Sequence, residues 1–269
     1  MKQEFKKGRE KTEKLISVAL LPQNKVKSVL ISDEFPEIIK TLNNKYNINT
    51  VTVNKNPALD APISKHADCC LLQLNNNVFI EQNNYKNIVN YLTNTTGEEK
   101  PNFHIIPESV FSPYPNDVLL NAKVIGDKII CNTKYLSEAV TKYALEFGFD
   151  IINVNQGYAA CSSITVRENA LITDDESIYV SSKSNGIDCI LISKGSVKLN
   201  GYEYGFIGGT CGMIDKNLLA FTGKINNHTD AELIINFLSK HNVRYTELSS
   251  GPLVDIGGII PLTELNEEL

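Results

Sequence analysis

Five side chains that could do chemistry stand just before apolar runs in this chain of 269 residues: His66, Asp68, Asp117, Cys161 and Asp255. Carboxylates that meet at one opening attract a cation, because otherwise they repel one another and raise each other's pKa. A thiol and an imidazole beside them are the groups of nucleophilic and acid–base catalysis. These residue types favour a site for a small cation, with His66, Cys161 and Asp255 as candidate catalytic groups.

Each of these residues also has a plain structural interpretation. An aspartate before a strand can cap the turn that leads into it. Cys161 has no histidine nearby in the sequence, so its surroundings favour a buried core thiol over a nucleophile. Ser162, Thr210 and Cys211 stand at equivalent positions, and we expect them to face the same opening.

Two further motifs could suggest a cofactor. The His-x-Asp spelling of residues 66–68 recurs at residues 228–230 and could bind a metal ion. The second copy precedes a predicted helix, however, where Thr229 with Glu232 has the spacing of a capping box. The glycine-rich run 205–212 lacks the Gly-Lys-Ser/Thr ending of a phosphate loop, and its glycines favour close backbone approach instead. We expect neither a metal nor another cofactor.

The candidate residues begin copies of one longer pattern. A polar or glycine-containing start is followed by a strand, a turn, a second strand, a helix and a third strand. The starts fall at residues 66, 116, 158, 205 and 252, which are 42 to 50 residues apart. A period in this range is typical of a solenoid, a propeller or a closed ring, because one such unit cannot bury its own apolar face.

The second copy shows the pattern most clearly. Residues 118–120 and 128–131 are predicted strands that flank a turn at Gly126-Asp127. Residues 136–147 carry apolar side chains at helical spacing and end at Gly148. In the fifth copy, residues 254–260 have the composition of the first strand.

The two ends of the chain complete each other. The fifth copy stops near residue 262, whereas residues 26–31, 34–46 and 48–53 have the patterns of the strand, helix and strand that it lacks. We therefore predict an α/β fold in which strand–strand–helix–strand units form a five-fold pseudosymmetric ring, with the N-terminal strand and helix completing the last repeat. Residues 26–269 would form a single domain, preceded by a solvated N-terminal arm at residues 1–25.

Composition limits the classes of partner that the protein is expected to bind. A net charge of −5 and a pI near 5.5 argue against a basic surface that binds nucleic acid. The six cysteines include no C-x-x-C pair, so neither a zinc knuckle nor a disulfide scaffold is indicated. The apolar stretch 15–21 ends at Pro22 and is too short to cross a bilayer. We expect a cytoplasmic protein whose partner is a small molecule.

The second copy also carries a likeness to a known family. Residues 116–120, Asn-Asp-Val-Leu-Leu, and the strand at 128–131 are similar to the Gly-Gly-Asp-Val-Leu strand and the next strand of the guanidino-group-modifying enzymes. These enzymes share the pentein fold, a ring of five such units, and include arginine deiminases, amidinotransferases and dimethylarginine hydrolases. The resemblance covers essentially residues 26–262, and the run 201–209 looks like a bacterial subfamily of the same fold.

The resemblance implies a guanidinium-recognising role for Asp117, but the family's catalytic set is replaced. Asp255 stands where the nucleophilic cysteine is expected, the general-acid histidine would fall near Ala159, and Tyr114 replaces an acidic partner. A thiolate at neutral pH needs an adjacent base or a cationic field. The family's usual covalent mechanism is therefore not expected here.

Two functions are consistent with these observations. In the first, the centre of the ring binds a guanidinium- or amine-containing molecule through Asp68, Asn116 and Asp117. A non-standard C–N hydrolase could then use a carboxylate as general base on water, assisted by Cys161 or His66. In the second, the chain is a binding or assembly module without chemistry, as in the ribosome anti-association factors of the same fold. The fold alone does not decide between them.

Overall fold

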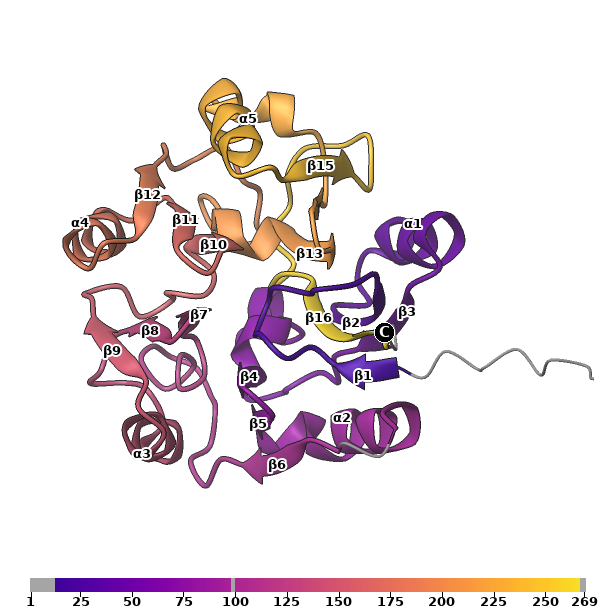
Figure 1. Cartoon of the computed structure of the whole chain (residues 1–269), viewed down its shortest axis with the longest axis vertical. Helices are drawn as coiled ribbons and strands as arrows, with labels where there is room; N and C mark the ends of the chain where they lie inside the picture. Colours follow the sequence, from indigo (N-terminus) through magenta and orange to yellow (C-terminus); the bar gives the residue numbers. More distant parts are fainter. Residues whose placement is uncertain (1–12, 98–99, 267–269) are drawn as a thin grey trace, which may run out of the picture.

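The computed structural model describes residues 13–97 and 100–266. Within these residues the chain forms five small sheets and five α-helices, and Figure 1 shows the sheets set around a common centre with the helices outside them. The first sheet, in spatial order, contains β1 (Glu13–Leu15), β16 (Ile260–Leu265), β2 (Val26–Ile31) and β3 (Asn49–Thr52). The other sheets contain β4 (Leu71–Leu74), β5 (Asn77–Ile80) and β6 (Asn102–Ile105); β7 (Lys123–Ile125), β8 (Lys128–Cys131) and β9 (Asp150–Asn153); β10 (Ser163–Arg167), β11 (Ala170–Thr173) and β12 (Asp188–Leu191); and β13 (Cys211–Asp215), β14 (Leu218–Phe221) and β15 (Arg244–Glu247).

The sheets follow one plan, in which two strands pair antiparallel and a third joins them in parallel. A parallel strand needs a crossover connection, and each helix supplies one. The helices are α1 (Pro36–Tyr46), α2 (Gln82–Thr95), α3 (Glu138–Glu146), α4 (Glu176–Ser184) and α5 (Ala231–Lys240). Apolar side chains between helices and sheets fill the core, where Phe79 and Phe221 are the largest fully buried side chains.

The second unit confirms part of the prediction. The strand at 128–131 is β8, and Gly126 in the turn before it has a φ of 58°, a conformation that glycine adopts without strain. The helix is shorter than predicted, because α3 begins only at Glu138.

The first strands begin later than predicted. Residues 118–120 form turns, and the first strand of that unit is β7. In the fifth unit, residues 254–259 are not a strand, because Gly257 and Gly258 have φ values of 75° and 83°, which an extended strand does not use. The polar starts are therefore turns, or short 3-10 helices such as η2 (Ala67–Cys69) and η3 (Ile207–Thr210), that lead into the strands.

The two ends of the chain meet as predicted. The predicted strand, helix and strand near the N-terminus are β2, α1 and β3, and β2 pairs antiparallel with β16 in a register that places Leu30 opposite Ile260. More than two hundred residues separate these partners. The first sheet is therefore completed by both ends of the chain (Figure 1).

Part of the predicted arm belongs to this sheet. β1 pairs with β16, and Ile16 next to it is fully buried. The buried carboxylate of Glu264 accepts hydrogen bonds from the backbone N–H groups of Gln23 and Asn24 at 2.6 and 2.8 Å. Residues 1–12 of the predicted arm lie outside the described residues, and a domain boundary at residue 26 stays a prediction. In the described part of the chain, no helix combines the length and apolar character needed to span a membrane.

Candidate functional site

The turns that precede the first strands bring the three candidate catalytic residues together. His66, Cys161 and Asp255 line a cavity of about 290 Å³, which we call the acidic cavity. His66 comes from the turn before β4, Cys161 from the turn before β10, and Asp255 from the turn before β16. These turns lie at the centre of the molecule, so residues far apart in the sequence share one space.

Asp68 joins His66 to Cys161. The Cys161 thiol donates a hydrogen bond to Oδ2 of Asp68, with Sγ and oxygen 2.7 Å apart. Nδ1 of His66 lies 4.0 Å from Oδ1 of Asp68 and 3.8 Å from Oδ1 of Asp255. All four residues are more than nine-tenths buried. The cluster combines a thiol, an imidazole and two carboxylates in a space largely shielded from water.

Backbone groups hold Asp255 in place. Its Oδ2 accepts a hydrogen bond from the N–H of Phe206 at 2.9 Å, and its Oδ1 accepts one from the N–H of Gly257 at 3.0 Å. Gly209 packs against the same carboxylate so closely that a Cβ there would lie 1.8 Å from Oδ1. The predicted role of the glycines in the run 205–212, close backbone approach, is confirmed at this position.

Asn121 positions Cys161 and was not predicted from the sequence. Its amide group donates to Sγ of Cys161 at 3.0 Å, and its Oδ1 accepts from the N–H of Ala160 at 2.9 Å. Asn121 is almost completely buried. The signal that could have identified Asn121 is its polar amide inside the apolar run 118–125. A buried amide needs hydrogen-bond partners for all its polar atoms, so such a residue is expected to hold its neighbours in place.

Aromatic rings form the walls of the acidic cavity. Tyr158, Tyr202, Tyr204 and Phe206 line it, together with Leu199. The Phe206 ring centroid lies 5.8 Å from that of Tyr158 and 6.4 Å from that of Tyr204. Aromatic faces attract cations because of their quadrupole. A cavity with aromatic walls and the carboxylate of Asp255 in its lining suits a cation better than an anion.

Asp117 and Asn116 take positions that differ from the expectation. Asp117 is buried, but it is not among the residues that line the acidic cavity. Its Oδ2 accepts a hydrogen bond of 2.6 Å from the hydroxyl of Tyr158, which does line it. Asn116 donates from its side chain to the carbonyl of Pro113 and so stabilises a turn. Asp117 therefore contacts the lining of the acidic cavity through the Tyr158 hydroxyl.

Burial dominates the electrostatics of the site. It raises the pKa of Asp255, and the carboxylate of Asp68 raises it further, whereas His66 lowers it. Burial also raises the pKa of the Cys161 thiol, and the carboxylate of Asp68 adds to this effect. The pKa of Asp117 is raised by burial and lowered in part by the Tyr158 hydroxyl. The thiol therefore stays protonated near neutral pH when the site is empty.

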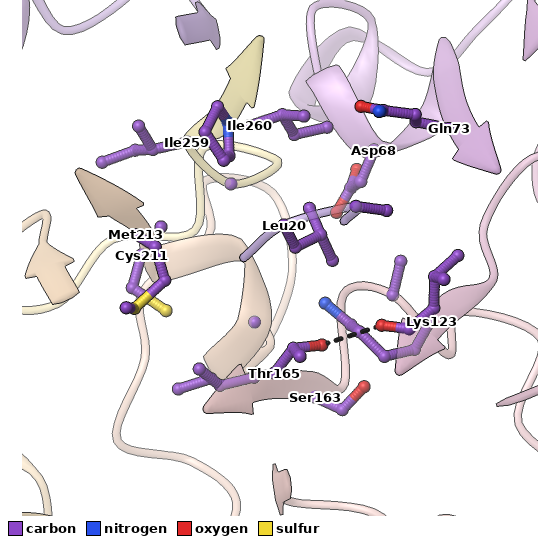
Figure 2. Close-up of a pocket in the computed structure, with 18 of the residues that line it drawn as sticks. Leu20, Asp68, Gln73, Lys123, Ser163, Thr165, Cys211, Met213, Ile259 and Ile260 are labelled. Carbon is purple, nitrogen blue, oxygen red and sulfur yellow. Dashed lines mark hydrogen bonds between the residues drawn. The ribbon is translucent and has the colours of Figure 1, made fainter. Parts of the chain in front are cut away.

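A second cavity of about 70 Å³ is lined by Asp68, and we call it the inner cavity. Figure 2 shows its walls, with Asp68 on one side and Lys123 on another. Ser163, Thr165 and Cys211 also line it. Asp68 lines the inner cavity and is not among the residues that line the acidic cavity, but it contacts Cys161 and lies near His66, which do line it. Of the residues expected to face one common opening, Cys161 and Cys211 line different cavities.

The second His-x-Asp motif is a helix start. Nδ1 of His228 accepts a hydrogen bond from the N–H of Asp230 at 2.9 Å, directly before α5. The predicted capping box is wrong, because Asp230 is the N-cap residue and its side chain makes no cap hydrogen bond. Thr229 instead contacts the hydroxyl of Ser196. Among residues 13–97 and 100–266, no group of three or more His, Cys, Asp or Glu side chains is arranged to hold a metal ion.

Solved structures with a similar fold are guanidino-group-modifying enzymes. SxtG, an amidinotransferase of the saxitoxin pathway from Microseira wollei, matches with a TM-score of 0.53 and 11% identity over 87% of this chain and 91% of that chain. Agmatine deiminase from C. jejuni matches with a TM-score of 0.50 and 12% identity over 92% and 93% of the two chains. DDAH from Pseudomonas aeruginosa, complexed with citrulline, matches with a TM-score of 0.51 and 9% identity over 90% and 100%. The predicted likeness to the pentein fold is confirmed.

Sequence comparison assigns the chain to a family. Residues 30–260 match the model of the family of unknown function DUF6873, and the protein belongs to this family. No curated protein sequence matches the chain.

Proposed function

We propose that this protein is a pentein-like ring of five pseudosymmetric units that binds a small guanidinium- or amine-containing cation in the acidic cavity. The observation that carries the proposal is the composition of the cavity lining. Asp255 and Glu203 supply acidic groups and His66 an imidazole, four aromatic rings form the walls, and no lysine or arginine is present among the lining residues. Such a lining attracts a positive charge and offers an anion no partner.

The volume and the polar groups suit a small molecule. A cavity of about 290 Å³ is at the lower end of the range typical of ligand pockets, roughly 300–1,000 Å³. The two carboxylate oxygens of Asp255 each accept one backbone hydrogen bond and keep further lone pairs for a ligand. A planar guanidinium can pair with a carboxylate and stack on Tyr158 or Phe206.

Calorimetry with charged and neutral ligands of matched shape tests the proposal. Agmatine and arginine should bind, whereas citrulline, which keeps the shape of arginine without the side-chain charge, should bind at least about tenfold more weakly, a difference of roughly 1.4 kcal/mol. Asp255→Asn should abolish this preference. Asp150→Asn, at an exposed aspartate of β9, is the matched control. Equal binding of arginine and citrulline would exclude a site selective for cations.

Asp117 should contribute through Tyr158. Asp117→Ala should weaken cation binding by roughly 2–4 kcal/mol, since it removes a buried negative charge and releases the Tyr158 hydroxyl. Tyr158→Phe keeps the charge and removes only the hydrogen bond, so it should cost less. If Asp117→Ala lowers the melting temperature strongly and leaves binding unchanged, Asp117 is a structural residue.

A second candidate function is hydrolysis of a C–N bond with Cys161 as the nucleophile. The short contact between Sγ and Oδ2 of Asp68 favours it, because the carboxylate can accept the thiol proton. A bound guanidinium would offset the acidic neighbours that raise the pKa of the thiol. Sγ would then attack the guanidinium carbon and form a C–S bond, and one nitrogen would leave with a proton from His66. Water would cleave the C–S bond and restore the thiol, giving a ureido product.

Product analysis separates this reaction from binding alone. Ammonia and a ureido product should form from agmatine or arginine with the wild-type protein and be lost in Cys161→Ala. Cys211→Ala is the control, because Cys211 lines the inner cavity only. Binding without turnover would support the cation-binding function and exclude the hydrolase function. No binding of any guanidino or amino compound would favour the remaining alternative, an assembly module without chemistry.

A further inference from the structure

The inner cavity contains a lysine that the proposed function does not use. Lys123 lies in β7 and is 93% buried, with a relative exposure of 7%. Figure 2 shows its amino group directed into the cavity. Within the described residues its ammonium forms no ion pair or hydrogen bond, and burial lowers its pKa. A buried ammonium without partners is costly, so its position requires a compensating charge or water.

Asp68 presents the complementary group in the same cavity. Its Oδ2 accepts the hydrogen bond from Cys161, but its buried Oδ1 has no hydrogen-bond partner in the described part of the chain. Both Asp68 and Lys123 line the inner cavity. A water molecule needs roughly 10–15 Å³ of such volume and two or more polar partners, and the cavity offers about 70 Å³.

We propose that Lys123 and Asp68 form a buried ion pair bridged by water across the inner cavity, which makes Lys123 a positioning residue for the Asp68 carboxylate. The pair places a positive charge next to Asp68 in the inner cavity, outside the residues that line the acidic cavity. Lys123 would thereby hold the Asp68 carboxylate in the position where it accepts the hydrogen bond from Cys161 and lies near His66.

The surroundings identify which groups act on the pair. Burial lowers the pKa of Lys123, whereas the carboxylate of Asp68 raises it; the neutral thiols of Cys211 in β13 and of Cys161 before β10 also lie near its ammonium. On the other side, Asp68 faces His66 and Asp255 from the acidic cavity, and Cys69 adjoins it in η2. Ser163 and Thr165 add hydroxyl groups to the inner cavity. Asp68 is the one carboxylate among the groups that line this cavity, so it is the natural partner of the ammonium.

The first test does not involve a ligand. A high-resolution crystal structure should show at least one water within hydrogen-bond distance of both Nζ of Lys123 and Oδ1 of Asp68. The titration of Lys123, followed by NMR of labelled lysine, should move to lower pH by about one unit in Asp68→Asn. Asp255→Asn is the matched control and should leave the Lys123 titration nearly unchanged. A dry inner cavity, or equal Lys123 titrations in wild type and Asp68→Asn, would overturn the proposal.

The second test rests on the proposed cation binding. Lys123→Met should fold, because replacing a buried charge by an apolar side chain of similar size is often neutral or stabilising. The pH below which agmatine binding is lost should rise by about one unit in this variant. Lys128→Met, at the half-buried lysine of β8 that pairs with the exposed Asp127, should leave the profile unchanged. An unchanged profile in Lys123→Met would contradict the inference, whereas failure of agmatine to bind the wild type would reject the proposed function and leave the first test decisive.

Discussion

The thiol of Cys161 donates a hydrogen bond to Asp68 across 93 residues of sequence, and the two atoms lie 2.7 Å apart. The first residue stands before β10 and the second in η2, so the contact exists only because two units meet at the centre of the molecule. The carboxylate raises the pKa of the thiol, in the same direction as burial. The contact therefore stabilises the thiol form of Cys161 in the empty site.

Removing the charge of Asp68 should make this thiol more reactive. In Asp68→Asn, the pKa of Cys161 should fall, and its alkylation by iodoacetamide at pH 7.5 should accelerate by about tenfold for each unit of that change. Mass spectrometry of the Cys161 peptide measures the rate, with Asp150→Asn as a control. Alkylation at the wild-type rate in Asp68→Asn would show that burial alone protects the thiol.

Asp174 should make stability depend on pH. Burial raises the pKa of Asp174 to about 7, although its Oδ2 accepts a hydrogen bond from the N–H of Ile207. The folded state thus holds the proton more tightly than the unfolded state does. The stabilisation from this proton is fully present below 3.8, the pKa of an aspartate in the unfolded chain, and is lost as the pH rises through about 7.

Urea unfolding between pH 4 and pH 8 measures this effect. Asp174 should contribute a decrease of at most roughly 4 kcal/mol in the free energy of unfolding across that range. Asp174→Asn should remove that part of the slope and should be more stable than the wild type at pH 8. A variant with the same slope as the wild type would assign the pH dependence to other groups.

Gly209 should tolerate no side chain. A Cβ at this position would lie 1.8 Å from Oδ1 of Asp255, so Gly209→Ala should displace the carboxylate and lower the free energy of unfolding by about 1–3 kcal/mol or more. Gly251→Ala is the matched control, because its Cβ would meet its nearest neighbour, Oγ of Ser249, at 3.6 Å. Chemical denaturation compares the two variants. Equal stability of both would mean that the backbone near Asp255 can move at little cost.

The N-terminal segment should contribute to stability from β1 onward. A chain that starts at residue 22 loses β1 and the fully buried Ile16, whose side chain alone is expected to contribute about 2–5 kcal/mol. A chain that starts at residue 32 also loses β2, the strand between β16 and β3, and should not fold. Circular dichroism and thermal melting measure both. A folded product of the longer deletion would disprove the pairing of the two chain ends as a requirement for folding.

Local pattern was sufficient for some of the regular elements. The bounds of β2 and β8 agree with the sequence prediction, because apolar periodicity and turn residues act over a few neighbours. The completion of the first sheet by both chain ends was also predictable, since the repeat pattern lacked one piece at one end and had it at the other. His66, Cys161 and Asp255 could be selected as candidates from their place before the apolar runs.

Tertiary packing decided the arrangement of the site. Gly257 and Gly258 adopt left-handed conformations, so the segment predicted as a strand is a turn. Only the packed structure shows that Asp117 contacts the lining of the acidic cavity through Tyr158. The burial of Lys123 and the hydrogen bonds of Asn121 likewise depend on units far apart in sequence. A repeat pattern specifies which strands pair within a unit. Which side chains meet at the centre depends on how closely the backbones of different units approach, and periodicity contains no information about that distance.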